Sequence, residues 1–169
     1  VCGITVQHSV AKQEAVVKVL VMGAGRMGAI RVEDLAADPR VTEVMITNRN
    51  QPKAQALADQ FGATVVPWDN ATDRIADAVV VAVGTDGHEF VLNGVLPHAL
   101  PVLCEKPIAL TVEATQAVID LAKRSGSGLQ IGFQRRFDSA IREVHDTIES
   151  GAVGTLYALT MTAHDFTPS

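Results

Sequence analysis

Three glycines carry the first chemical signal in this sequence. They have the spacing G-x-G-x-x-G, they directly follow the apolar run Val16–Met22, and an amphipathic segment comes after them. In a dinucleotide site one such glycine makes the tight turn, one lets the backbone approach a pyrophosphate, and one lets the helix pack closely on the strand. The helix N-terminus presents unpaired N–H groups and a positive dipole end to the phosphates. The strand–turn–helix context therefore predicts a dinucleotide-binding site formed by Gly23, Gly25, Arg26, Met27 and Gly28.

The residues after the second expected strand bear on which dinucleotide binds. An NAD site usually carries Asp or Glu about 20 residues beyond the glycines, where the carboxylate accepts hydrogen bonds from the ribose. Here that position is Asn48, and Arg49 follows it. A neutral side chain removes the charge that would repel a 2′-phosphate, and a guanidinium can bind one. We therefore predict NADP as the cofactor; NAD is the alternative if Arg49 is only a solvated loop residue.

The composition excludes several classes of protein. The chain has 169 residues, 47% of them apolar and 20% charged, with a formal net charge of −5. This balance is ordinary for a soluble globular protein and favours no nucleic-acid partner. No apolar run approaches the roughly 20 residues that span a bilayer, and the N-terminus does not resemble a secretory signal. We expect a cytoplasmic protein without a membrane partner.

The two cysteines have no metal-ligand spacing, so we expect no metal site. Cys104 ends a strand-like run, where buried reduced thiols are common. A structural role for this thiol, in a reducing compartment, is the interpretation that we favour.

Strand-like and helix-like segments alternate along the chain, which is typical of a parallel sheet with crossover helices. The fold class that we predict is α/β, with a Rossmann-type doubly wound parallel sheet. The expected strands are Val16–Met22, Val41–Thr47, Ala63–Val66, Asp77–Val83, Val102–Cys104 and Leu129–Phe133. The expected helices are Met27–Ala37, Pro52–Phe61, His88–Leu96, Val112–Arg124 and Ser139–Ser150.

The two ends of the chain depart from this alternation. We expect residues 1–14 to be a disordered leader, residues 15–138 to form the nucleotide-binding domain, and residues 139–169 to begin a second domain. Thr155–His164 is longer and richer in Thr than the other strand candidates. We predict that it is the first strand of an incomplete α+β substrate domain, because a lone strand cannot bury its apolar face. The chain therefore looks like a fragment or a protein that relies on a partner.

Several motifs together resemble the Gfo/Idh/MocA family of oxidoreductases. Cys104–Pro107 reads CEKP, Leu129–Asp138 reads LQIGFQRRFD, and Gly151–Gly154 reads GAVG. The resemblance covers about residues 16–169, and the FQRRFD segment is most similar to the bacterial inositol dehydrogenase branch. It implies hydride transfer between a nicotinamide and a secondary hydroxyl of a sugar or polyol such as an inositol.

The resemblance also implies roles for individual residues. Lys106 would lie near the nicotinamide and the substrate hydroxyl, where an ammonium can stabilise developing alkoxide charge. Glu105 would orient either the cofactor ribose or Lys106, and Pro107 would fix the turn, with a cis peptide as one way to do so.

The segment at Val83–His88 matches the family only in part. Thr85 and His88 align with a Thr-Pro-Thr-x-x-His segment beside the cofactor, but Val83 and Gly84 stand where Thr and Pro are usual. We expect Val83, Thr85 and His88 to contact the cofactor, although His88 at the start of a helix suits packing or capping equally well. Arg136 is a further candidate for binding phosphate or an inter-domain acid, with a structural ion pair as the alternative.

The family's catalytic Asp and His belong to an Asp-x-x-x-His motif in its second domain. Asp77 and Asp86 do not begin that spacing, because Val81 and Phe90 occupy the fourth position after each. We therefore expect this chain alone to bind cofactor but to be inactive as a dehydrogenase. The competing hypothesis is a non-catalytic NAD(P)-binding sensor module, against which the intact Glu-Lys-Pro counts. Homo-oligomerisation through the C-terminal sheet is also expected.

Overall fold

The computed structural model describes residues 17–71 and 75–162. The chain divides into two compact units that meet between Gly132 and Phe133. The expected leader, residues 1–14, lies outside the described residues.

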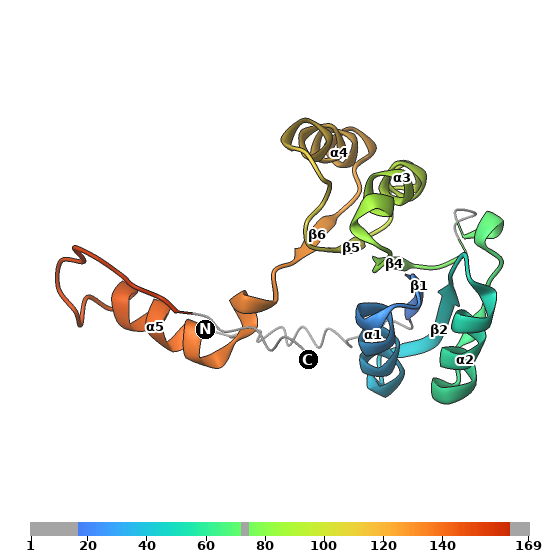
Figure 1. The fold of residues 1–169 in the computed structure, drawn as a ribbon, viewed down its shortest axis with the longest axis horizontal. Helices are drawn as coiled ribbons and strands as arrows, with labels where there is room; N and C mark the ends of the chain where they lie inside the picture. The colour runs from blue at the N-terminus through green and yellow to red at the C-terminus, as the bar shows by residue number, and fades with distance from the viewer. Residues whose placement is uncertain (1–16, 72–74, 163–169) are drawn as a thin grey trace, which may run out of the picture. The chain divides into compact units, whose positions relative to one another are not determined.

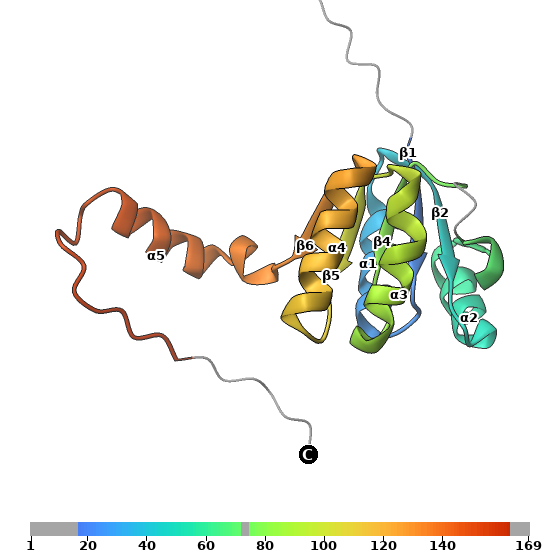
Figure 2. The same ribbon diagram turned by 90° about the horizontal axis from the view of Figure 1, so that it is seen from above.

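The first unit alternates strands and helices throughout (Figures 1 and 2). Its strands are β1 (Val17–Met22), β2 (Val41–Thr47), β3 (Thr64–Val65), β4 (Ala78–Val81), β5 (Val102–Glu105) and β6 (Leu129–Gly132). Its helices are α1 (Arg26–Ala37), α2 (Gln51–Phe61), α3 (Thr85–Val95) and α4 (Val112–Ser125), with short 3₁₀ turns η1 (Trp68–Asn70) and η2 (Leu96–His98).

The six strands form one parallel sheet in the order β3-β2-β1-β4-β5-β6. The strand order reverses between β1 and β4, so the connections leave these two neighbours toward opposite faces of the sheet. In an open α/β sheet the crevice at this point, beyond the carboxyl ends of the strands, is where ligands bind. The loops that follow β1, β4 and β5 therefore meet at the edge of the sheet that suits a cofactor.

The core has two layers, one on each face of the sheet. Leu20 and Met22 of β1 belong to the cluster that includes buried residues of α3 and α4. Val19 and Val21 belong to the cluster that includes buried residues of α1 and α2. This alternation follows from the two-residue period of a strand, and Figure 1 shows the two helix pairs on opposite faces. Both faces are covered, which explains why the strands are almost continuously apolar.

The structure confirms the predicted α/β fold class and the six strands and four helices of the sheet region. Bounds differ by a few residues at most of the ends. The helix expected over His88–Leu96 begins earlier, at Thr85, because Gly84 takes the N-cap position in extended backbone. His88 therefore lies one turn inside α3 rather than opening it.

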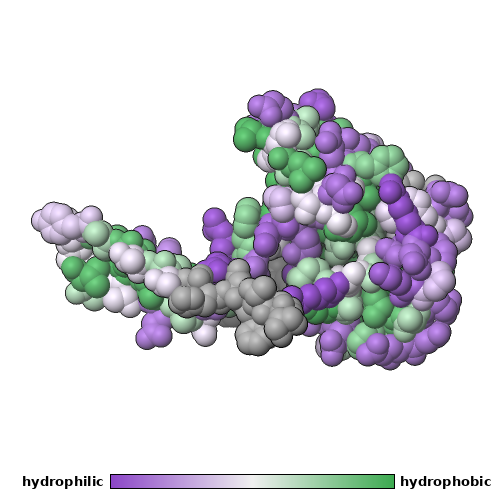
Figure 3. Space-filling model, viewed as in Figure 1, coloured by the Kyte–Doolittle hydropathy of each residue, from purple (hydrophilic) through white to green (hydrophobic). Residues whose placement is uncertain are grey.

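The second unit contains η3 (Gln134–Phe137) and the predicted helix α5 (Ser139–Glu149). Asp138 caps α5, since its side chain accepts a hydrogen bond from the Ile141 N–H at 3.1 Å. Several large apolar side chains of this unit are exposed, and Figure 3 shows hydrophobic patches on it. They include Phe137, Leu156, Tyr157, Leu159 and Met161.

The strand predicted over Thr155–His164 is not formed in residues 155–162, which have no regular secondary structure. The prediction is wrong there, and positions 163 and 164 lie outside the described residues. The physical reason is that a strand needs a neighbouring strand for its backbone hydrogen bonds, and no described segment pairs with this one.

None of the helices in the described part of the chain has the length and apolar character needed to cross a membrane.

Candidate functional site

The glycine-rich turn after β1 is closely packed at two of its three glycines. Gly23 has a φ of +118°, and a Cβ there would overlap the carbonyl of Ala82. A Cβ on Gly28 would overlap the carbonyl oxygen of Gly23, so only glycine lets α1 approach β1 this closely. Gly25 is different, because nothing lies within 4 Å of its Cβ position.

The open space at Gly25 faces the start of α1. Gly25 is the N-cap of that helix, no side chain caps it, and Arg26 beside it is exposed. The first N–H groups of α1 therefore meet no capping side chain, which is the arrangement that suits a pyrophosphate. Met27 is half-buried and packs with the core on the α1 side of the sheet. The residues present fit the phosphates of a dinucleotide.

The two residues after β2 lie on this edge as predicted from the sheet order. The side chain of Asn48 accepts a hydrogen bond from the Ala24 N–H at 3.3 Å and donates one to the Asn50 carbonyl at 3.0 Å. Arg49 is exposed, and its guanidinium carbon lies 5.4 Å from the ring centre of Trp68 and 5.7 Å from that of Phe90. Cation–π attraction to two rings restricts where this guanidinium moves.

The loop after β4 is tied to the loop after β5 by His88. The His88 side chain is buried, with 1% of the residue exposed. Its Nδ1 lies 2.7 Å from the Pro107 carbonyl oxygen, and its Nε2 lies 3.1 Å from the Val83 carbonyl oxygen. Thr85, at the start of α3, and Val83 are half-buried. The imidazole thus connects two loops from inside the unit.

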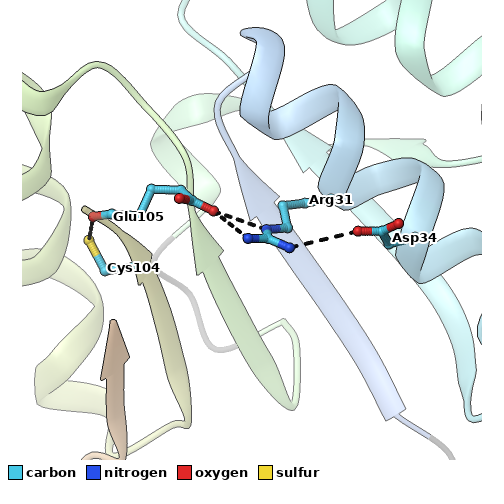
Figure 4. A network of polar contacts seen from close by, with 4 residues as sticks. All are labelled: Arg31, Asp34, Cys104 and Glu105. Carbon is cyan, nitrogen blue, oxygen red and sulfur yellow. Dashed lines mark hydrogen bonds and ion pairs between the residues drawn. The ribbon is translucent and has the colours of Figure 1, made fainter. Parts of the chain in front are cut away.

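The Glu-Lys-Pro segment ends β5 at the same edge. The Glu105 carboxylate is buried and accepts two hydrogen bonds from Arg31 of α1, at 3.0 Å from Nε and 2.7 Å from Nη2 (Figure 4). Lys106 is exposed, and the Lys106–Pro107 peptide is cis, the option foreseen for the turn. The structure therefore places an exposed ammonium in the loop next to a charge-paired carboxylate.

Arg136 belongs to the second unit, in η3, where its side chain is exposed. Its predicted contact with phosphate or an inter-domain acid stays a prediction.

Sequence reasoning missed Arg31, Gly132, Trp68 and Phe90. Arg31 had one available signal, because it lies three residues after Gly28 and so one helical turn further along α1. Gly132, Trp68 and Phe90 had none, since each meets its partner through the folding of segments far apart in sequence.

No group of three or more His, Cys, Asp or Glu side chains arranged to hold a metal ion occurs within residues 17–71 and 75–162.

Cys104 is a free, buried thiol in β5. Burial, together with a smaller effect of the neighbouring Glu105 charge, raises the pKa of Cys104 from 9.0 to about 12. Thiolate is the reactive form of cysteine. We expect Cys104 to resist a thiol reagent near neutral pH in a folded Cys2→Ser variant and to react fully in denaturant; rapid labelling of the folded protein would contradict its burial.

The same pKa shift predicts how stability changes at alkaline pH. The folded-state pKa of Cys104 lies above 9.0, so ionisation of this thiol does not reduce the stability of the fold below pH 9. As the pH rises toward about 12, the thiol ionises more readily in the unfolded chain, and the stability falls. The free energy of unfolding should fall by up to about 1.4 kcal/mol per pH unit over this window. Urea unfolding at several alkaline pH values should show a flatter dependence for Cys104→Ala than for the unmodified chain.

Comparison with known proteins agrees with this geometry. The model of the oxidoreductase family with an NAD-binding Rossmann fold matches residues 17–133. The chain is 31% identical to myo-inositol dehydrogenase Hyg17 of Streptomyces leeuwenhoekii, over 89% of this chain and 46% of that protein. It is 30% identical to inositol 2-dehydrogenase of Rhizobium meliloti strain 1021, over 85% of this chain and 44% of that protein. The chain thus spans about half the length of the curated relatives that it matches.

Solved structures give the same result. Myo-inositol dehydrogenase from Lactobacillus casei, in complex with NAD(H) and myo-inositol, is 29% identical with a TM-score of 0.75, over 82% of this chain and 43% of that one. Myo-inositol dehydrogenase from Corynebacterium glutamicum is 29% identical with a TM-score of 0.74, over 83% of this chain and 43% of that one. The matching family model, the inositol dehydrogenase relatives and the shared sheet confirm the resemblance found in the sequence: the chain belongs to the Gfo/Idh/MocA family of oxidoreductases.

Proposed function

We propose that this chain is the cofactor-binding portion of an NADP-dependent dehydrogenase that acts on a secondary hydroxyl of a sugar or polyol such as an inositol. The observation that carries the proposal is the placement of the Glu-Lys-Pro segment. It lies at the carboxyl end of β5, in the same sheet as the glycine-rich turn that follows β1. The relatives that are inositol dehydrogenases support the substrate class.

Lys106 has the central chemical role in this proposal. A bound nicotinamide supplies the acceptor or donor of hydride. The exposed Lys106 ammonium donates a hydrogen bond to the substrate oxygen whose carbon loses or gains the hydride. This contact is strongest when negative charge develops on the oxygen, so it stabilises the transition state more than the ground state.

A base must accept the proton of the substrate hydroxyl. This chain has no Asp-x-x-x-His motif that would supply one. We propose that the base lies in a second domain outside these residues and that the chain alone binds cofactor without turnover. Oxidation of inositols by NADP⁺, followed by nicotinamide absorbance, tests this. Steady turnover by the chain alone would contradict it; cofactor binding without turnover in a protein that supplies the second domain would favour the sensor hypothesis.

The preference for NADP rests on Asn48 and Arg49. The Asn48 amide replaces a carboxylate, and the rings of Trp68 and Phe90 keep the Arg49 guanidinium near the end of β2. A relative solved with NAD(H) favours NAD as the alternative. An ionic hydrogen bond to the 2′-phosphate contributes about 1.5–3 kcal/mol, so we expect NADPH to bind roughly 10 to 100 times more tightly than NADH.

Trp68 provides the measurement for cofactor choice, since it is the single tryptophan of the chain and lies beside Arg49. Titration of its fluorescence with NADPH and NADH should give unequal affinities, and Arg49→Ser should make them similar. Asn48→Asp should favour NADH, because a carboxylate accepts ribose hydroxyls and repels phosphate. Equal affinities in the unmodified chain would reject the role of Arg49.

We also propose a reducing cytoplasm as the compartment, which the free, buried Cys104 supports.

A further inference from the structure

The ion pair between Arg31 and Glu105 joins helix α1 to the end of strand β5 at the same proposed site. Arg31 lies in α1, and Glu105 is the last residue of β5, immediately before Lys106. Both guanidinium hydrogen bonds end on one carboxylate oxygen, Oε1, at 3.0 and 2.7 Å. The two side chains are only 24% and 10% exposed, so water screens the pair weakly. Two charge-assisted bonds of this kind hold that carboxylate oxygen in place.

Gly132 of β6 leaves space for the Glu105 carboxylate. It pairs with Glu105 in the β5–β6 ladder, and a Cβ there would lie 3.1 Å from Oε2 and 3.3 Å from Oε1. That spacing is tighter than side chains normally accept, so the absence of a side chain at Gly132 makes room for the carboxylate. The Glu105 carboxylate is thus bonded to the guanidinium of Arg31 and occupies the space that a side chain at position 132 would need.

The residue on the other side of Lys106 is held as well. The carbonyl of Pro107 lies 2.7 Å from Nδ1 of the buried His88. Lys106 itself is exposed, and within residues 17–71 and 75–162 its ammonium forms no ion pair. The structure therefore restrains the Glu105 side chain and the Pro107 carbonyl, on either side of Lys106, and leaves the Lys106 ammonium exposed.

We propose that Arg31 is a positioning residue for Lys106: by holding the Glu105 carboxylate against Gly132, it fixes the backbone from which the Lys106 side chain extends. This inference rests on the proposed function, in which the Lys106 ammonium meets the reacting oxygen. A catalytic group that is displaced by about 1 Å can lose about 100-fold in rate, so this restraint matters for the chemistry.

Backbone NMR relaxation of the whole chain tests the restraint directly. The chain contains five lysines, so selective ¹⁵N-lysine labelling gives a simple spectrum in which Lys106→Arg identifies the Lys106 amide. We expect an order parameter of about 0.85 for this amide in the unmodified chain, falling below about 0.6 in Arg31→Lys and in Gly132→Ala. Arg31→Lys keeps a positive charge beside Glu105 but cannot form the planar two-bond contact.

The controls separate positioning from general loss of structure. The amides of Lys18 in β1 and Lys123 in α4 should keep their order parameters in every variant. Asp34→Asn should leave the order parameter of the Lys106 amide unchanged. Asp34 is largely exposed, and its carboxylate lies 3.7 Å from Nη1 of Arg31, which is not one of the two nitrogens bonded to Glu105. A Lys106 amide that stays rigid in Arg31→Lys and Gly132→Ala, or one already mobile in the unmodified chain, would overturn the proposal.

Cofactor titration distinguishes this proposal from the proposed function. If the Lys106 amide responds as expected but neither NADPH nor NADH changes the fluorescence of Trp68, the restraint is real and the proposed function fails. If a cofactor binds but the Lys106 amide does not respond to the substitutions, the proposed function stands and the role of Arg31 fails.

Discussion

Gly25→Ala should fold normally and lose cofactor binding, whereas Gly28→Ala should lose a large part of the stability of the domain. The reason is the different surroundings of two glycines in one turn. A Cβ on Gly28 would overlap a backbone oxygen of Gly23, which cannot rotate away as a side chain would. Forced overpacking of this kind destabilises by about 1–3 kcal/mol or more, a large part of the roughly 5–15 kcal/mol that keeps a domain folded.

Gly25 has open space instead, and its φ of −84° is accessible to alanine. Alanine is a poorer N-cap than glycine, so we expect a loss of less than about 1 kcal/mol in stability. Its methyl group would occupy the space through which the pyrophosphate approaches the backbone. We expect cofactor affinity to fall at least about 100-fold, or about 2.7 kcal/mol.

Urea unfolding and fluorescence titration measure the two effects separately. Gly62→Ala is a useful comparison, because Gly62 also has open space around its Cβ position but a left-handed φ of +73° at the end of α2. It should lower stability by about 1 kcal/mol without changing cofactor affinity. Unimpaired binding by Gly25→Ala, or normal stability of Gly28→Ala, would contradict this account of the turn.

The second large effect is expected at the ion pair of α1 and β5. Arg31→Met should destabilise the domain by about 3–5 kcal/mol, because it leaves the Glu105 carboxylate buried without a compensating charge. Only 7% of Glu105 is exposed, so water cannot replace the guanidinium. The double variant Arg31→Met with Glu105→Gln should recover most of this loss, because a neutral amide is far less costly to bury than an unpaired charge.

Urea unfolding of the two single variants and the double variant gives the coupling free energy. Arg40→Met is the matched control, since Arg40 forms a close ion pair with Asp38 on the surface. That pair holds the pKa of Asp38 at about 2, through hydrogen bonds from Arg40, but both groups are in contact with solvent. A surface pair contributes little, so Arg40→Met should change stability far less than Arg31→Met. Equal losses would mean that burial of Glu105 does not matter.

The fold could be predicted from the sequence because its signals are local. Short apolar runs alternate with amphipathic segments, and the G-x-G-x-x-G spacing identifies the first turn. Parallel strands joined by helices then leave few arrangements, since crossover connections are right-handed. The prediction of a strand over Thr155–His164 was wrong in residues 155–162 because it used local strand propensity alone. A strand forms only beside another strand, and local propensity does not show whether a neighbour is present.

Local sequence patterns predict the sheet, the glycine turn at Gly23–Gly28 and the position of Lys106 after β5. They do not predict what surrounds Lys106, which depends on contacts between distant segments. Arg31 and Glu105 are 74 residues apart, and His88 and Pro107 are 19 apart. No periodicity links such pairs, because the folding of α1, α3 and β5 onto one sheet creates their contacts. The motif therefore marks the residue that bears the chemistry, and long-range packing determines how firmly that residue is held.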